Sequence, residues 1–73
     1  MTLDQLPKRQ PSVIKEINTE YVPLKLIEMG CIPGNIVEIL QIAPFLDPIY
    51  IRVNDTFLSI RRDLAEQIEV ELI

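Results

Sequence analysis

Turn-forming residues divide this chain into apolar segments that are long enough only for strands and single turns of helix. The divisions fall at Asn18 to Glu20, at Gly30 to Asn35, at Ala43 to Pro48 and at Asn54-Asp55. Between the last two, "IYIRV" (Ile49 to Val53) alternates apolar and polar side chains, which is typical of a half-buried strand. The pattern predicts a small, mainly β protein, and 73 residues indicate a single domain spanning 1–73.

We expect five strands, over Ser12–Ile17, Asn35–Ile42, Ile49–Val53, Thr56–Arg61 and Ile68–Ile73. A short helix is expected from Pro23 to Met29, because proline fits the first helical turn, and Asn18 or Thr19 would cap it. A single helical turn is expected just before the last strand, in which Ile68, Val70 and Leu72 would point inward. Short strands with tight connections favour an SH3-like β-barrel of about five strands, closed so that no edge is exposed. The short helix would cover one end of the barrel.

Both glycines of the chain lie in one stretch, "MGCIPGN", which runs from Met29 to Asn35. Gly30 follows the expected helix and would close it with a positive φ, which glycine adopts without steric cost. Pro33 and Gly34 form a turn, since proline presets φ at the first central position and glycine accepts a positive φ at the second. Cys31 lies between them among apolar neighbours, so we expect a small buried hydrophobic side chain.

The charge balance argues against several classes of partner. The chain carries 7 Lys and Arg against 11 Asp and Glu, a net charge of -4. Nucleic acids and anionic membrane surfaces select proteins with a basic face, so neither is an expected partner. The N-terminal stretch lacks the apolar run of a signal peptide, and no run approaches the roughly 18 apolar residues of a membrane span. We therefore expect a soluble, cytoplasmic protein without direct membrane insertion.

The residue types present also argue against catalysis and cofactor binding. The chain has no histidine for proton transfer near neutral pH and no glycine-rich phosphate loop. Asp47 precedes a proline and Asp55 belongs to a hairpin, so turn formation explains both. A stable ferrous iron site needs imidazole, thiolate or clustered carboxylates, and neither aspartate has such neighbours in the sequence. We expect no enzyme, no cofactor and no specific metal site.

The chain resembles a known family in three stretches, "LIEMGCIPGNIVEI", "APFLDPIYIRV" and "FLSIRRDLAEQIEVE". This is the FeoA family of ferrous iron transport proteins. The order and spacing of the three stretches match the family, and the resemblance covers about Leu3 to Leu72. The resemblance implies an SH3-like barrel that acts as an adaptor by contacting the cytoplasmic part of FeoB, a GTPase-coupled membrane transporter. The alternative is a regulatory module similar to the C-terminal domain of iron-dependent transcriptional repressors, with weak transition-metal binding. Such repressors need a helix-turn-helix, for which this chain has no room, so the adaptor is favoured.

Candidate partner-contact residues are Phe45, Leu46, Asp47 and Arg62. Compared with the family pattern, Leu46 replaces the glycine before Asp47, and "EYVPLKL" replaces arginines that often precede the helix. Phe45 and Leu46 either form an exposed apolar surface, for the transporter or for a second copy of this chain, or fold back and plug the end of the barrel. We expect Arg61 to make ion pairs or backbone hydrogen bonds and Arg62 to be exposed.

Overall fold

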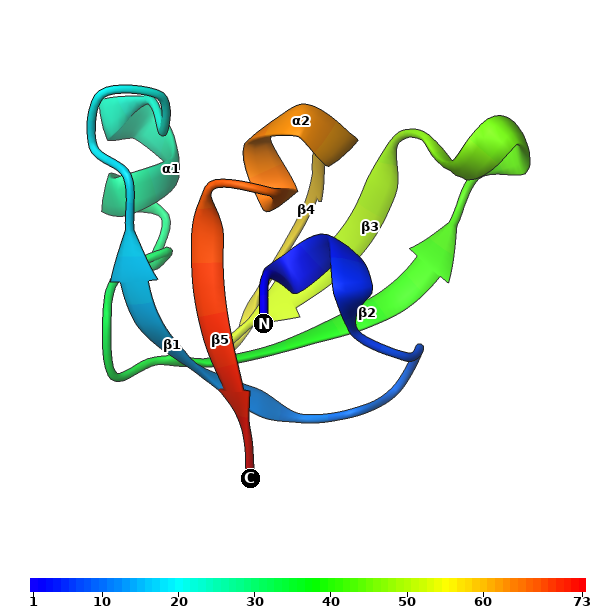
Figure 1. The fold of residues 1–73 in the computed structure, drawn as a ribbon, viewed down its shortest axis with the longest axis horizontal. Helices are drawn as coiled ribbons and strands as arrows, with labels where there is room; N and C mark the ends of the chain where they lie inside the picture. The colour runs from blue at the N-terminus through cyan, green and yellow to red at the C-terminus, as the bar shows by residue number, and fades with distance from the viewer.

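The computed structural model describes all residues of the chain, 1–73 (Figure 1). Its five strands are β1 (Ser12–Ile17), β2 (Ile36–Ile42), β3 (Ile49–Val53), β4 (Thr56–Ile60) and β5 (Ile68–Leu72). The helices are α1 (Leu24–Glu28) and α2 (Arg62–Ala65), and two 3-10 turns are η1 (Leu3–Gln5) and η2 (Pro44–Leu46). The predicted strands, the short helix and the helical turn before the last strand are thereby confirmed.

The strands form one antiparallel sheet in the order β4-β3-β2-β1-β5, which curls around its own inner face (Figure 1). The register shifts between Ile14 and Glu16 in β1 and between Ile39 and Gln41 in β2. Such bulges bend and twist a strand, and so help the short sheet to curl. The expected closure is wrong, because β4 and β5 are the two ends of the sheet and no ladder joins them.

The N-terminal segment covers part of the inner face of the sheet, which the strands themselves leave open. Leu3 and Leu6 are buried, and η1 lies beside β5 and α2 (Figure 1). The carbonyl oxygen of Met1 accepts a hydrogen bond of 2.8 Å from the N–H of Val70 in β5. The segment therefore contributes to the core, a role that sequence patterning did not indicate because two leucines are too few to show a periodicity.

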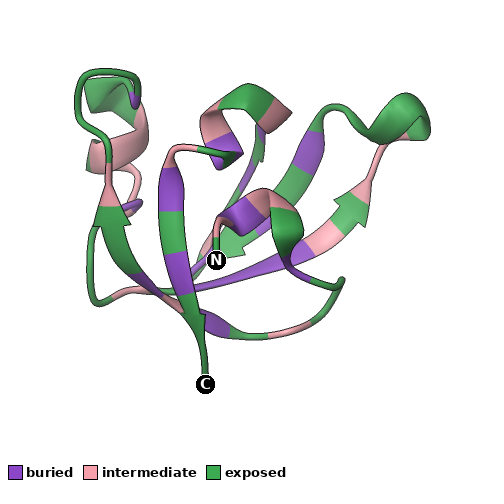
Figure 2. Cartoon of the chain, viewed as in Figure 1, coloured by how far each residue is buried: buried purple, intermediate pink, exposed green.

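The core takes one alternating set of side chains from each strand (Figure 2). Ile49, Ile51 and Val53 of β3 are fully buried, as their alternation predicted. Leu72 was expected inside but is 53% exposed, so that prediction is wrong; the end of β5 lies beyond the core. Glu38 of β2 is only 8% exposed, and it pairs with Arg52 opposite it on β3, which compensates its burial.

The backbone around α1 confirms the two glycine predictions and corrects the capping prediction. Gly30 has φ +113 after the helix, and Gly34 has φ +96 in the turn that follows. Pro23 is extended and lies just before the first helical residue. The Asn18 side chain does not cap α1, because its Oδ1 accepts a hydrogen bond of 3.2 Å from the N–H of Glu20. Cys31 is fully buried, as expected.

Candidate interaction surface

The loop between β2 and β3 projects from one end of the molecule (Figure 1) and carries the largest fully exposed apolar side chain. Phe45 is 99% exposed and Leu46 is 60% exposed. The alternative in which both side chains plug the barrel is therefore wrong. An aromatic ring held in water loses the hydrophobic stabilisation that burial would give, so such a ring is a candidate for contact with a partner.

Hydrogen bonds within the loop hold its backbone. The N–H of Ala43 donates to the carbonyl of Pro48 at 3.1 Å, and the N–H of Leu46 donates to the carbonyl of Ala43 at 2.9 Å. Phe45 and Leu46 both have a positive φ, +66 and +68, and the peptide bond between Asp47 and Pro48 is cis. A Cβ costs roughly 1–2 kcal/mol in the left-handed region, so the fold must compensate two such residues in succession.

Arg62 of α2 fixes the base of this loop. Its Nε donates a hydrogen bond of 3.0 Å to the carbonyl oxygen of Leu46, and its backbone N–H donates one of 3.0 Å to Oδ1 of Asp47. Its Nη1 donates to the carbonyl oxygen of Asp4 at 3.3 Å and lies 3.7 Å from Oδ2 of the same residue. One side chain thus joins η1, the β2–β3 loop and the start of α2.

The structure encloses Arg62, and it leaves Arg61 exposed with the kind of ion pair expected of it. The side chain of Arg62 is only 27% exposed, so the prediction that it is solvent-facing is wrong. Arg61 has a 76% exposed side chain, whose single ionic contact is Nε to Oδ1 of Asp63 at 3.7 Å. Arg61 is extended just before α2, whereas Arg62, the first residue of the helix, makes the hydrogen bonds to the loop. Leu46, Asp47 and Arg62 are therefore brought together, while Gly30, Pro33 and Gly34 lie in the separate turn after α1.

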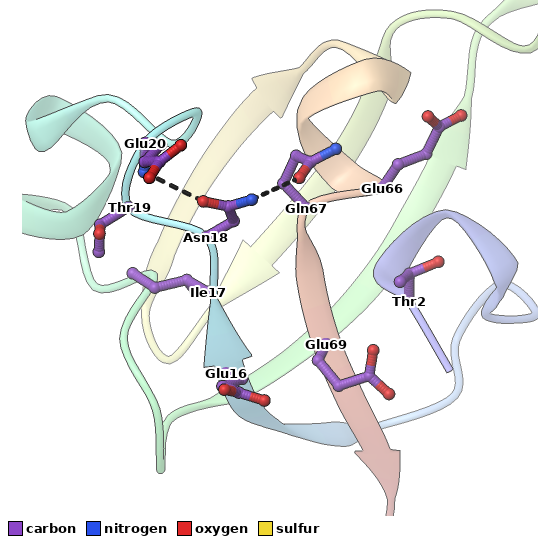
Figure 3. A pocket seen from close by; sticks show the side chains of 9 residues that line it. All are labelled: Thr2, Glu16, Ile17, Asn18, Thr19, Glu20, Glu66, Gln67 and Glu69. Atoms are coloured by element: carbon purple, nitrogen blue, oxygen red, sulfur yellow. Dashed lines mark hydrogen bonds between the residues drawn. The ribbon is translucent and has the colours of Figure 1, made fainter.

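A polar groove of about 450 Å³ lies between the end of β1 and the start of β5 (Figure 3). Its lining residues are Thr2, Glu16, Ile17, Asn18, Thr19, Glu20, Glu66, Gln67 and Glu69. Nδ2 of Asn18 donates a hydrogen bond of 3.2 Å to Oε1 of Gln67 across it. Neither this groove nor the rest of the chain holds a group of three or more His, Cys, Asp or Glu placed to bind a metal ion.

The family model of the FeoA domain matches residues 1–72 of the chain. The chain belongs to the FeoA domain family. It is 39% identical over 74 residues to the Fe(2+) transport protein A/Fe(2+) transporter FeoB fusion protein of Porphyromonas gingivalis, a match that covers 100% of this chain and 9% of that relative. This FeoA domain therefore spans less than a tenth of the curated relative's length.

Solved structures agree with the assignment to the family and with the predicted fold. Iron(II) transport protein A from Clostridium thermocellum is 36% identical with a TM-score of 0.88, over 100% of this chain and 46% of that one. FeoA from Stenotrophomonas maltophilia, described as an SH3 domain protein complexed with zinc, has a TM-score of 0.83 at 24% identity, over 97% and 89% of the two chains. The manganese regulator SloR has a TM-score of 0.77 at 20% identity, over 100% of this chain and 34% of its own. The last two likenesses show the SH3-like fold alone. No helix of this FeoA domain is both long and apolar enough to span a bilayer.

Proposed function

We propose that this FeoA domain is an accessory protein of ferrous iron uptake that acts by contacting the cytoplasmic part of a FeoB-type membrane transporter. The observation that carries this proposal is the Phe45 side chain, exposed at the tip of a loop that Arg62 fixes to the rest of the fold. A loop that is already ordered loses little conformational entropy when it binds, and a large aromatic side chain is a common anchor of protein interfaces.

The relative from Porphyromonas gingivalis supports the choice of partner, because its name joins the two proteins in one fusion. Fusion raises the effective concentration of two domains for each other, which favours domains that act together. The proposed mode of action needs no active site, no cofactor and no bound metal ion, since contact with the transporter is sufficient. A repressor-like regulatory role has no comparable support, because the likeness to SloR is one of fold.

The proposal is tested by replacing the apolar side chains of the loop. We expect the double variant Phe45→Ser/Leu46→Ser to lose about thirtyfold or more in affinity for the FeoB transporter purified from the same organism, as loss of a central aromatic anchor does. Its thermal unfolding should stay close to that of the unmodified protein, because both side chains are largely in water. Ferrous iron uptake by cells carrying the variant should fall in parallel.

A matched control is available on the other side of the fold. Tyr21, which precedes α1, and Leu24, its first residue, are 61% and 68% exposed, so Tyr21→Ser/Leu24→Ser removes one exposed aromatic and one exposed aliphatic side chain. This control should bind the transporter as the unmodified protein does. Loss of binding in the control and not in the loop variant would move the contact to α1. Unchanged binding and iron uptake in the loop variant would eliminate the Phe45–Leu46 loop as the contact.

A further inference from the structure

The two edges of the sheet differ in how they are protected. The β5 edge carries Glu69 and Glu71, and an isolated bridge pairs Thr2 with Glu69. The β4 edge, "TFLSI", has no strand beside it and contains neither a charge nor a proline. Natural sheets normally protect an exposed edge with charges, proline or a covering segment, so an edge without these devices is available for pairing with another strand.

The hairpin geometry decides which backbone groups of β4 are unpaired. Val53 and Thr56 close a two-residue turn at Asn54-Asp55, which places them in a hydrogen-bonded pair. Hydrogen-bonded and non-hydrogen-bonded pairs alternate along an antiparallel ladder, so Phe57 and Ser59 are in non-hydrogen-bonded pairs with β3. Their N–H and C=O groups therefore point away from β3. Both side chains are exposed on the outer face of the sheet.

We propose that β4 pairs with β4 of a second copy of this chain, antiparallel about a two-fold axis at Leu58. In that register Phe57 of each copy lies opposite Ser59 of the other, and both residues have outward backbone groups. Four hydrogen bonds form, two from each Phe57–Ser59 pair, and the two five-stranded sheets join into one. This is an isologous contact, in which the same surface is used by both copies.

Charged residues at the two ends of β4 favour this register. They also favour a second copy of this chain as the strand that pairs with β4. Asp55 precedes β4 by one residue and Arg61 follows it by one, so pairing about Leu58 places Asp55 of each copy opposite Arg61 of the other. Opposite charges directly across a strand pair are stabilising, and this arrangement has two such pairs. The Arg61 side chain is 76% exposed and only loosely paired with Asp63, so it is free to make the contact.

Aromatic side chains extend the contact on the outer face. The rings of Tyr50 and Phe57 stack with centroids 6.4 Å apart, and the two residues are 42% and 54% exposed. In the paired sheet the Tyr50–Phe57 stack of one copy lies next to that of the other. This follows because the two Phe57 residues are on adjacent strands, diagonally across from each other. The interface remains small, so the dimer forms reversibly as concentration rises.

Charge reversal tests the register. The single variants Asp55→Arg and Arg61→Asp each place like charges opposite one another, and we expect about a tenfold or larger weakening of self-association by analytical ultracentrifugation. An equimolar mixture of the two variants restores both opposite-charge pairs and should dimerise as the unmodified protein does. The Phe45→Ser/Leu46→Ser variant should self-associate normally, which separates this proposal from the contact with the transporter. Circular dichroism confirms that each variant is folded.

Amide hydrogen exchange gives a second readout. The N–H groups of Phe57 and Ser59 should become protected as the protein concentration rises, whereas that of Tyr21, already bonded to Asn18 within the chain, should not change. A protein that is monomeric at about millimolar concentration would overturn the proposal. Single variants that associate as well as the unmodified protein, or a mixture that does not recover, would overturn it as well.

Discussion

The backbone N–H of Arg62 donates a hydrogen bond of 3.0 Å to Oδ1 of Asp47, 15 residues earlier in the chain. Helix α2 has no side-chain cap from the residue that precedes it, so this carboxylate satisfies one of its free N–H groups. Because the guanidinium of Arg62 also bonds to Leu46, the loop and α2 hold each other in place.

Replacing Arg62 by leucine should lower the free energy of unfolding by about 1–3 kcal/mol, because hydrogen bonds from a charged donor to Leu46 and Asp4 are lost. The adjacent substitution Arg61→Leu is the control and should change stability by less than about 0.5 kcal/mol, since that side chain is exposed. Urea titration at low protein concentration measures both. Equal effects of the two substitutions would contradict the role assigned to Arg62.

Leu46→Gly should stabilise the protein by about 0.5 kcal/mol. The glycine relieves the strain of a Cβ at φ +68, and this gain exceeds the extra entropy that glycine gives the unfolded chain. Ser59→Gly is the control, an exposed strand position with no positive φ, and it should instead destabilise by about 0.5–1 kcal/mol. The same sign of change at both positions in thermal unfolding would show that Leu46 is not strained.

Local chemistry accounts for the parts of the fold that the sequence predicts. The alternation in β3, the turn at Asn54-Asp55 and the positive φ of Gly30 and Gly34 each depend on a few neighbouring residues. The short strands and their tight connections favoured an SH3-like barrel, and the resemblance to the family implied the same fold.

Several parts of the structure that sequence patterns did not indicate depend on contact between segments far apart in the chain. Leu3 is buried by β5 and α2, and no local pattern distinguishes it from an exposed leucine. Arg61 and Arg62 are equivalent in sequence, and only the position of Asp4 and Leu46 in the folded chain decides which of the two is enclosed. The loop from Ala43 to Pro48 and its candidate contact residues could therefore be predicted from the sequence. The hydrogen bonds that join this loop to Arg62 of α2 could not.

Gly34→Val should destabilise the fold by more than about 1 kcal/mol, because a β-branched residue is strained at φ +96. A Cβ at this position would meet nothing within 4 Å, so the loss is one of backbone conformation and not of packing. Gly34→Asn should cost less, since asparagine tolerates positive φ better than valine. An unchanged denaturant midpoint for the valine variant would contradict this account of the turn.

Cys31 should react slowly with iodoacetamide in the folded protein and rapidly in denaturant. The side chain is fully buried, and burial raises the pKa of the thiol above its ordinary value, so the reactive thiolate is scarce as well as inaccessible.

The unfolded chain loses the Cys31 thiol proton first as pH rises, because the pKa is higher in the folded protein. The free energy of unfolding should therefore fall as pH passes the ordinary thiol pKa, and it should be unaffected by this group at lower pH. Cys31→Ala, which removes the titrating group, should be less stable at neutral pH but should lack this part of the alkaline loss. An alkaline loss of equal size in the two proteins, measured by urea titration across the alkaline range, would show that the thiol titrates alike in both states.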